Sequence, residues 1–337
     1  MSQENAGIKR SNWKEDLRAV LDNWSQTSSN VILSADVDGL LSCAIVAAQY
    51  PVHVAGVYTT THLLLLDGAT RMDAADALWL DHDVSEPGVK CIGQHLVHHA
   101  STDVLPLREP QSFNPNVWVR QDWKNSFSGR NGKKRDKFPF GTAHFLANAF
   151  DLDLGEEVSP LASLLAHADG TWRTVVDYRP NAEIWQDLMF KDDGFLVHLR
   201  DDWANSSTHL KSHADLVSGL IAIGVSNSPS RAKIASLLPV DLQMLTGRQS
   251  IRIDSRNVQD GIDRVKKVLD YVATQVGSKP TMSSKHTSTI SGVVDTPYPD
   301  KISNFDDFMI ENEIFSHAFT DLRTLRYTTG IKLRVKS

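Results

Sequence analysis

The stretch VILSADVDGLLSCAIVAAQ, residues 31–49, decides the fold class of this chain. It begins with the β-rich triplet 31–33, continues through the short acidic segment Asp36-Val37-Asp38-Gly39 and ends in an apolar run over 40–49. The triplet is typical of a buried strand and the apolar run of a buried helix. The acidic segment therefore lies where a strand ends and a helix follows, which is the place where α/β sheets bind their ligands.

The same alternation continues through the first half of the chain. Strands are expected at 52–58, 62–66, 77–80 and 89–92, and further helices at 12–24, 141–150 and 160–168. Strands that alternate with helices imply an α/β fold with a mainly parallel sheet flanked by helices.

The second half of the chain has a different composition. Helices are expected at 216–223, 258–276 and 305–312, a strand at 287–294 and paired strands at 324–327 and 331–335. We therefore expect two domains, an α/β domain over 1–205 and a smaller α+β domain over 206–337. The smaller domain is the expected contact surface for a homo-oligomer or a protein partner.

Composition narrows the class of protein. The chain has 337 residues, is 41% hydrophobic and carries a formal net charge of −6, which argues against a generally basic nucleic-acid coat. Cys43 and Cys91 lack metal-type spacing and are expected to be buried thiols in a reducing compartment. Residues 1–10 are polar and the apolar runs are short, so we expect a cytoplasmic protein without a membrane segment.

Two carboxylates lie close together in the acidic segment. Residues two apart in an extended chain face the same side, so the side chains of Asp36 and Asp38 are expected to be neighbours. Neighbouring carboxylates repel each other unless a cation lies between them, and Mg²⁺ and Mn²⁺ prefer oxygen ligands. A turn with solvated acids is the alternative interpretation of this short pattern.

Further candidate ligands follow in the same half of the chain. Asp81 and Asp83 come directly after the strand expected at 77–80, and Asp169 follows the apolar helix expected at 160–168. Histidines gather between these acids, at His95, His98 and His99. Each residue has a structural interpretation of its own, but their order along the chain indicates a shared site.

That order resembles the DHH phosphoesterase superfamily, which includes RecJ-type exonucleases, nano-RNA and pAp phosphatases, and manganese pyrophosphatases. Residues 34–42 resemble the family's first motif, D-x-D-G after a strand, while Asp81 resembles its second, metal-bridging aspartate and Asp169 its fourth motif. The resemblance covers roughly residues 30–175. It implies a DHH-type domain with one or two Mn²⁺ or Mg²⁺ ions, held by Asp36, Asp38, Asp81, His95 and Asp169.

The chain departs from the family pattern in two places. Ile32 and Ser34 stand where the family has a further His or Asp ligand. The D-H-H triplet is absent as such, and it aligns either with Gly93-Gln94-His95 or with Val97-His98-His99. We favour the first alignment because it follows the strand 89–92 directly, whereas the second has a spacing from Asp81 nearer to the family's. Under either alignment, one metal site has fewer protein ligands than usual.

The resemblance implies phosphoester hydrolysis. The metal would activate water and neutralise charge on the phosphoryl oxygens, and the implied catalytic residues are Asp81, His95, His98 and His99. A basic run inserted in the same domain is the candidate contact for a nucleic-acid backbone, and a solvated loop is its alternative interpretation. Its basic residues are Arg130, Lys133, Lys134, Arg135 and Lys137.

Two functions are therefore expected, and a nucleic acid or nucleotide is the expected substrate of the first. The first is a metal-dependent phosphoesterase, a nuclease acting on single-stranded or short nucleic acid. The alternative is a catalytically degenerate DHH-like protein that binds nucleic acid, nucleotide or a partner protein without hydrolysis. The missing ligand before Asp36 and the broken triplet motivate the alternative.

Overall fold

We describe the protein from a computed structural model. The description covers residues 12–96, 112–119, 137–153, 159–171, 178–190, 257–296, 302, 305–321 and 324–334. The helix expected at 216–223 and the domain boundary expected near residue 206 lie outside these ranges. In the part of the chain that is described, none of the helices is both long and apolar enough to cross a membrane.

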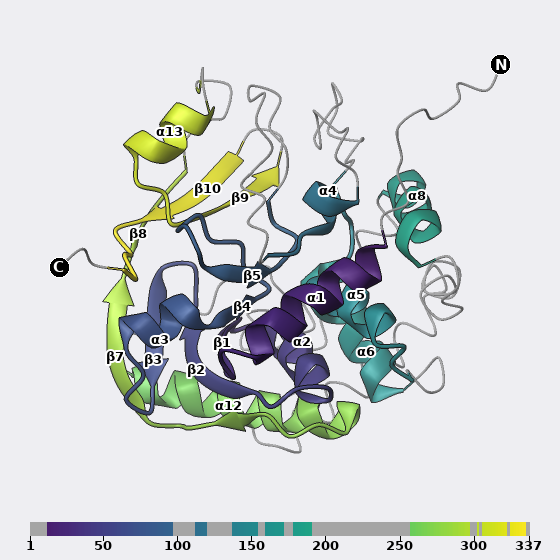
Figure 1. Cartoon of the computed structure of the whole chain (residues 1–337), viewed down its shortest axis with the longest axis horizontal. Helices are drawn as coiled ribbons and strands as arrows, with labels where there is room; N and C mark the ends of the chain where they lie inside the picture. Colours follow the sequence, from purple (N-terminus) through teal and green to yellow (C-terminus); the bar gives the residue numbers. More distant parts are fainter. Residues whose placement is uncertain are drawn as a thin grey trace, which may run out of the picture.

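A mixed, mostly parallel sheet forms the centre of the protein, as the sequence predicts (Figure 1). Its first four strands run parallel to one another, in the order β5 (Lys90–Ile92), β4 (Leu78–Leu80), β1 (Asn30–Ser34) and β2 (His53–Tyr58). β3 (His62–Leu66) pairs antiparallel with β2, and β7 (His286–Ser291) pairs antiparallel with β3. The short β6 (Thr281–Met282) pairs with β2.

Alternate side chains of the strands enter two separate cores. In β1, Val31 and Leu33 face one core while Ile32 faces the other, and in β4 Trp79 shares the core of Ile32. This follows from the two-residue period of a strand, and apolar residues at every position are typical of a strand that is covered on both faces.

Several of the described helices contribute to the core on the first face. Among them are α1 (Trp13–Ser25), α2 (Val37–Ala47), α5 (Thr142–Ala149), α6 (Pro160–His167), α8 (Arg179–Met189) and α12 (Val258–Val276). α2 is buried over almost all of its length, because α5, α6 and α12 all pack against it. α3 (Arg71–Asp76), which the sequence interpretation missed, packs on the other face with residues from the end of the chain.

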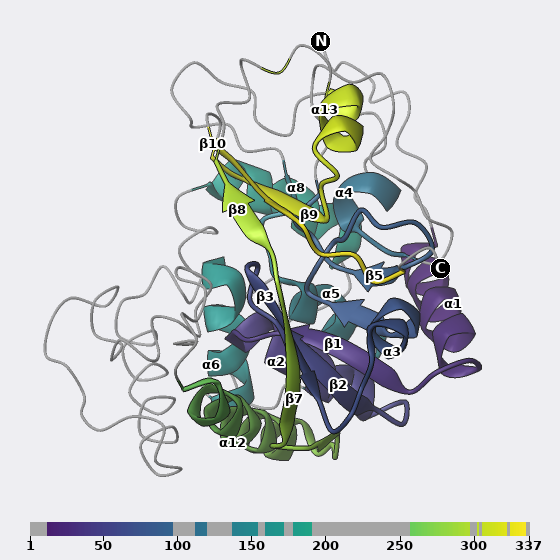
Figure 2. The same ribbon diagram turned by 90° about the vertical axis from the view of Figure 1, so that its left-hand side faces the viewer.

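Part of the predicted second domain belongs to the large sheet. α12 ends at Gly277, whose φ is 77°, and the chain then supplies β6 and β7 to the sheet of the first domain. The remaining C-terminal elements form a separate three-stranded antiparallel sheet with one helix (Figure 2). They are β8 (Val293–Asp295), β10 (Thr324–Thr329), β9 (Ser316–Asp321) and α13 (Phe305–Glu311).

The C-terminal strands lie where they were expected in part, and they differ from the expectation in two respects. The strand expected at 287–294 is interrupted at Gly292, where an added Cβ would lie 2.5 Å from the Thr328 side chain. β10 pairs with β8 and β9 rather than with a strand after residue 330. Gly330, with φ at 80°, turns the chain, and Ile331 and Leu333 are instead buried against the large sheet.

Candidate active site

Neighbouring parallel strands bring the first acids together. β1 pairs with β4 so that Leu33 lies opposite Leu80, and the segments that follow both strands emerge at the same edge of the sheet. Ser34 Oγ lies 2.8 Å from Asp36 Oδ1 and 2.7 Å from Asp81 Oδ2. A serine hydroxyl carries a single proton, so the two contacts are satisfied together when one of the carboxyl groups is protonated.

The segment that holds Asp36 and Asp38 is not extended, contrary to the expectation from the sequence. α2 begins at Val37, and Asp36 is its N-cap, with Oδ1 accepting the Gly39 N–H at 3.0 Å. Asp38 lies in the first helical turn. The unpaired N–H groups at a helix start favour a carboxylate at the N-cap, and this preference ends the extended conformation at Asp36.

Asp38 accepts hydrogen bonds from the start of a second helix, α5. Its Oδ2 accepts the N–H of Thr142 and its Oδ1 that of Ala143, each at 2.8 Å, so both oxygens are bound to the first turn of α5. Gly141 precedes this turn, and an added Cβ there would lie 2.6 Å from Asp38 Oδ2. The glycine is therefore needed for the close approach of α5 to the acid.

Asp81 is the centre of the cluster. Its side chain is 3% exposed, and besides Ser34 it contacts Thr142 Oγ1, which donates to Oδ1 at 3.0 Å, and His95 Nε2 at 3.2 Å. The backbone at Asp81 has φ at 60°, a left-handed conformation that costs free energy in a residue with a side chain. Asp169 also has a left-handed φ, of 48°.

The residues after β5 join Asp169 to this cluster. Gln94 is fully buried, and its Nε2 donates to Asp169 Oδ2 at 3.1 Å. The side chain of His95 is 27% exposed and lies beside Asp81, as its candidate role requires. The structure thus brings Gln94 and His95 to the acids, whereas His98 and His99 lie outside the described residues.

The three side chains of the segment Asp81-His82-Asp83 lie in different environments. Asp83 Oδ2 accepts the backbone N–H groups of His95 and Leu96, at 2.9 and 3.1 Å. The ring of His82 stacks edge-on against Tyr58 with ring centroids 4.8 Å apart, and burial lowers the pKa of His82 to about 3. His82 is therefore neutral, and Asp81 is the acid of this segment that faces the cluster.

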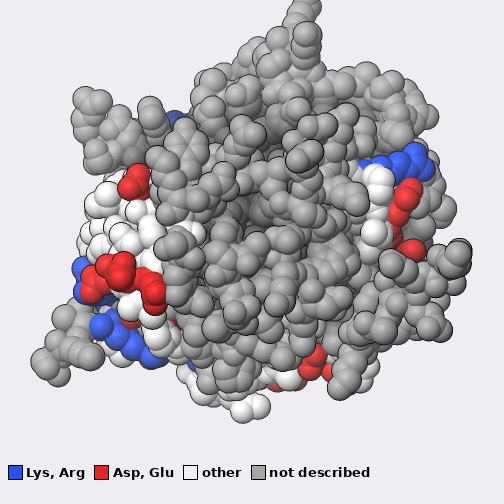
Figure 3. Space-filling model, turned by 90° about the horizontal axis from the view of Figure 1, so that it is seen from above, with Lys and Arg blue, Asp and Glu red and all other residues white. Residues whose placement is uncertain are grey.

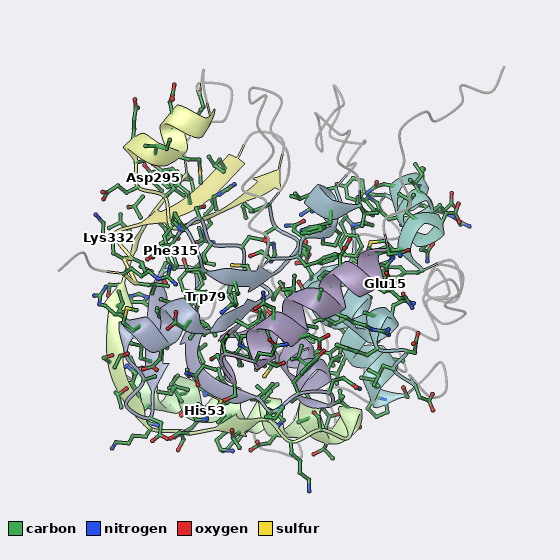
Figure 4. The ribbon with its side chains drawn as sticks, viewed as in Figure 1. Glu15, His53, Trp79, Asp295, Phe315 and Lys332 are labelled. Carbon is green, nitrogen blue, oxygen red and sulfur yellow. The ribbon has the colours of Figure 1, made fainter. Side chains whose placement is uncertain are left out.

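A cluster of aromatic side chains packs beside the segment Asp81-His82-Asp83. The ring centroids of Trp79 and Phe315, both labelled in Figure 4, are 5.4 Å apart, and Tyr58 packs edge-on against each of them. The Ser85 N–H also donates to the Phe315 carbonyl at 2.7 Å. The small sheet thereby fixes the chain just beyond the aspartates.

Burial and mutual repulsion raise the pKa values of these acids. Burial raises the pKa of Asp81 well above its usual value, and the charges of Asp36 and Asp169 raise it further. Burial likewise raises the pKa of Asp38, with Asp81, Asp169 and Asp36 adding to the shift, and the pKa of Asp36 is also raised, by burial first. The acids form one electrostatic group, and a dication is the partner that would relieve their repulsion.

The donor chemistry of this group fits Mg²⁺ or Mn²⁺, because all but one of the donors are oxygens. The arrangement of the side chains fits less closely. Within the described residues, no group of three or more His, Cys, Asp or Glu side chains is placed to hold a metal ion. Ser34, Thr142 and the start of α5 already donate hydrogen bonds to the carboxylate oxygens that would face a metal.

The candidate nucleic-acid contacts are almost entirely outside the described ranges. Arg130, Lys133, Lys134 and Arg135 lie there, and of the basic run only Lys137 is described. It is half-buried, and its carbonyl accepts from Asn181 Nδ2 at 2.8 Å. On the face seen in Figure 3, the charged side chains of the described residues lie in mixed groups of both signs at the margins.

Three residues of the site were missed as contributors by the sequence interpretation. Ser34 begins the segment that resembles the first motif but was given no role, although its position two residues before Asp36 could have indicated a hydroxyl at the site. Gln94 lies within the favoured triplet alignment, so its position was a signal. Thr142 gave none, because its contact with Asp81 joins residues 61 apart in the chain.

No family model, curated protein or solved structure matches this chain.

Proposed function

We propose that this protein is a divergent member of the DHH superfamily that hydrolyses phosphoester bonds with the help of Mn²⁺ or Mg²⁺. The observation that carries the proposal is the contact of two carboxyl groups, the half-buried Asp36 and the buried Asp81, with the one hydroxyl of Ser34. Asp36, Asp81 and Asp169 would hold the cation, with His95 beside them. When bound, the ion would neutralise a phosphate group and activate water for attack on phosphorus.

Other residues of the site would orient the ligands and move the proton. Ser34 and Thr142 orient the Asp81 carboxylate through their hydroxyl groups. Asp38 fixes the start of α5 and so the position of Thr142. His95 is far more exposed than Asp81, which lies 3.2 Å from its Nε2, so a substrate can reach the imidazole. His95 is therefore our candidate for the group that protonates the leaving oxygen.

The geometry favours one cation over two. Both oxygens of Asp38 are bound to backbone N–H groups, and position 93 is a glycine where the resemblance predicts an acid. The ligands left over are those of a single ion. The substrate we propose is single-stranded or short nucleic acid, supported by the basic run at 130–137 in the sequence.

The same observation supports a second candidate function. A cluster in which hydroxyl and backbone groups already bind most carboxylate oxygens can persist without metal, as expected of a protein that binds nucleic acid, nucleotide or a partner without hydrolysis. The two functions differ in one measurable property, which is metal-dependent turnover.

The deciding experiment incubates the purified protein with Mn²⁺ and end-labelled DNA and RNA oligonucleotides. Asp81→Asn is the test variant, and Asp187→Ala, which removes an exposed acid of α8 (Arg179–Met189), is the control. Cleavage by the wild type and the control, but not by Asp81→Asn or in EDTA, supports hydrolysis. Binding without cleavage in every tube supports the second function, and cleavage that survives EDTA contradicts the proposed mechanism.

A further inference from the structure

We propose that Asp83 is the positioning residue that holds Gln94 and His95 in the aspartate cluster, in place of an acid that position 93 lacks. Its catalytic consequence rests on the function proposed above. The inference itself rests on the backbone hydrogen bonds that one carboxylate oxygen accepts and on the space beside Gly93.

One oxygen of Asp83 ties three donors together. Oδ2 accepts the N–H of His95 at 2.9 Å, the N–H of Leu96 at 3.1 Å and Nδ2 of Asn114 at 3.1 Å. Asp83 is 6% exposed, so water does not compete for these bonds. The same Asn114 nitrogen also donates to the Leu96 carbonyl at 3.3 Å. Asn114 is therefore hydrogen-bonded both to Asp83 and to the backbone of the turn.

An acid at position 93 would make the same bonds locally. The side chain of an aspartate commonly accepts the backbone N–H groups two and three residues further along the chain, which from position 93 are those of His95 and Leu96. Asp83, which lies after β4 rather than within the turn, accepts hydrogen bonds from these same two N–H groups. It thus reproduces from outside the turn what an aspartate within the turn would do.

The two arrangements exclude each other. A Cβ added to Gly93 would lie 2.8 Å from Asp83 Oδ2 and 3.0 Å from Asp83 Cγ, so the carboxylate fills the space that a side chain at 93 would need. The φ of Gly93 is not in the left-handed region, so the backbone there accepts other residues once Asp83 is shortened. A remaining approach of 3.0 Å to the His82 carbonyl carbon needs a shift of a few tenths of an ångström.

The anchored turn carries both side chains that meet the acids. Gln94 and His95 reach Asp169 and Asp81 at 3.1 and 3.2 Å, and the amide bound by Asp83 belongs to His95 itself. Loosening the turn should therefore release both contacts. Asp83 does not touch the reacting atoms, so it acts only through this turn.

The test exchanges the acid between the two positions. We compare wild type, Asp83→Gly, the double variant Asp83→Gly with Gly93→Asp, and the surface control Asp187→Ala. The first readout is amide hydrogen exchange, measured by mass spectrometry in peptides covering residues 90–96. Exchange there should be about tenfold faster in Asp83→Gly and return to within about threefold of wild type in the double variant.

The second readout is Mn²⁺ affinity, measured by titration calorimetry. Affinity should fall about tenfold in Asp83→Gly and recover in the double variant, as expected for a residue that orients metal ligands. Unchanged exchange in Asp83→Gly, or a double variant no better protected than the single one, would overturn the inference. If Asp83→Gly does not fold, the double variant decides alone, since a folded double variant supports the exchange of roles and an unfolded one contradicts it.

The two proposals fail in different ways. A wild-type protein that does not bind Mn²⁺ contradicts the proposed function, but the exchange comparison still decides whether Asp83 holds the turn. Normal Mn²⁺ binding with unchanged exchange contradicts only the role of Asp83.

Discussion

The segments 36–38 and 81–83 have the same pattern, Asp-x-Asp after a strand of the parallel sheet, and they can be compared directly. In both, the first aspartate contacts Ser34. In both, the second aspartate accepts backbone N–H groups from another part of the chain, at the start of α5 or at residues 95–96. One acid of each pair faces the cluster and the other fixes the scaffold that completes it.

The difference between the segments lies in how the first acid is compensated. Asp36 caps α2 and accepts a backbone N–H of that helix, whose N-terminus favours negative charge. Asp81 caps no helix and adopts a left-handed backbone, and its carboxyl group contacts two hydroxyl groups, His95 and Asp38. We therefore expect a bound cation to stabilise the charge of Asp81 more than that of Asp36. The predictions below test this difference.

Removal of the Asp81 charge should have the largest effect. Asp81→Asn keeps the size of the side chain and removes the acid that we place at the centre of the cluster. We expect Mn²⁺-dependent cleavage to fall by about a thousandfold. The melting temperature should stay the same or rise, because a buried repulsion is relieved. A variant that keeps wild-type cleavage would mean that the chemistry lies elsewhere.

Asp38→Ala should destabilise the protein more than Asp36→Ala. Asp38→Ala leaves two buried N–H groups of α5 without an acceptor, so we expect a loss of about 2–3 kcal/mol. Asp36→Ala removes an ordinary N-cap, with an expected loss of about 1 kcal/mol. Denaturant unfolding of the two variants measures the difference, and the opposite order would show that Asp38 is not the anchor of α5.

The pH dependence of stability tests the shared charge. The folded-state pKa values of Asp36, Asp38 and Asp81 are raised, so these groups favour the folded state at low pH. This contribution is complete below the usual aspartate pKa and is lost as the pH rises through the raised values, at about 1.4 kcal/mol for each unit of pKa shift. Mg²⁺ or Mn²⁺ should restore stability at the high-pH end of this range.

Chemical denaturation from pH 4 to 8, with and without the ion, measures this effect. Asp81→Asn is the informative comparison because it should show a shallower loss of stability and a smaller gain from metal. Identical curves for wild type and variant would contradict the coupling of the acids.

The smallest effect is expected at Gln94. Gln94→His places an imidazole beside Asp169, where the favoured alignment predicts a histidine. We expect Mn²⁺ to bind about tenfold more tightly, as is typical when a ligand is added or oriented. Calorimetry measures the change, with Gln94→Asn as the control that keeps the amide. Weaker binding in Gln94→His would show that the amide, not an imidazole, suits this position.

Local pattern was sufficient for much of the fold. The apolar strands β1, β2 and β4 and the helices α1, α2 and α6 lie within a few residues of their expected positions, because burial on one or both faces leaves a clear period in the sequence. The proximity of Asp36 and Asp81 also followed, since acids after adjacent parallel strands emerge at one edge, whereas Asp169 follows a helix. Their shared electrostatics is visible in the raised pKa values of Asp36 and Asp81, to which the charge of Asp169 contributes.

Long-range packing set the rest of the architecture. The apolar period of α12 and the β-branched residues of β7 identify a helix and a strand but not the sheet that the strand joins. Likewise, Ile331 looked like part of a strand, whereas the turn at Gly330 and the apolar core beneath the large sheet placed it elsewhere. Pairing partners depend on surfaces that are distant in the sequence.

The sequence by itself determined that Asp36 and Asp81 directly follow apolar strands of a mainly parallel sheet, where acids emerge at the ligand-binding edge. Only the tertiary structure decided what each group does there. Asp38 and Asp83 look equivalent to Asp36 and Asp81 in the sequence, but a buried carboxylate takes the hydrogen-bond donors that lie nearest to it. For Asp38 those donors come from residues 104 and 105 positions away, and no local pattern carries that information.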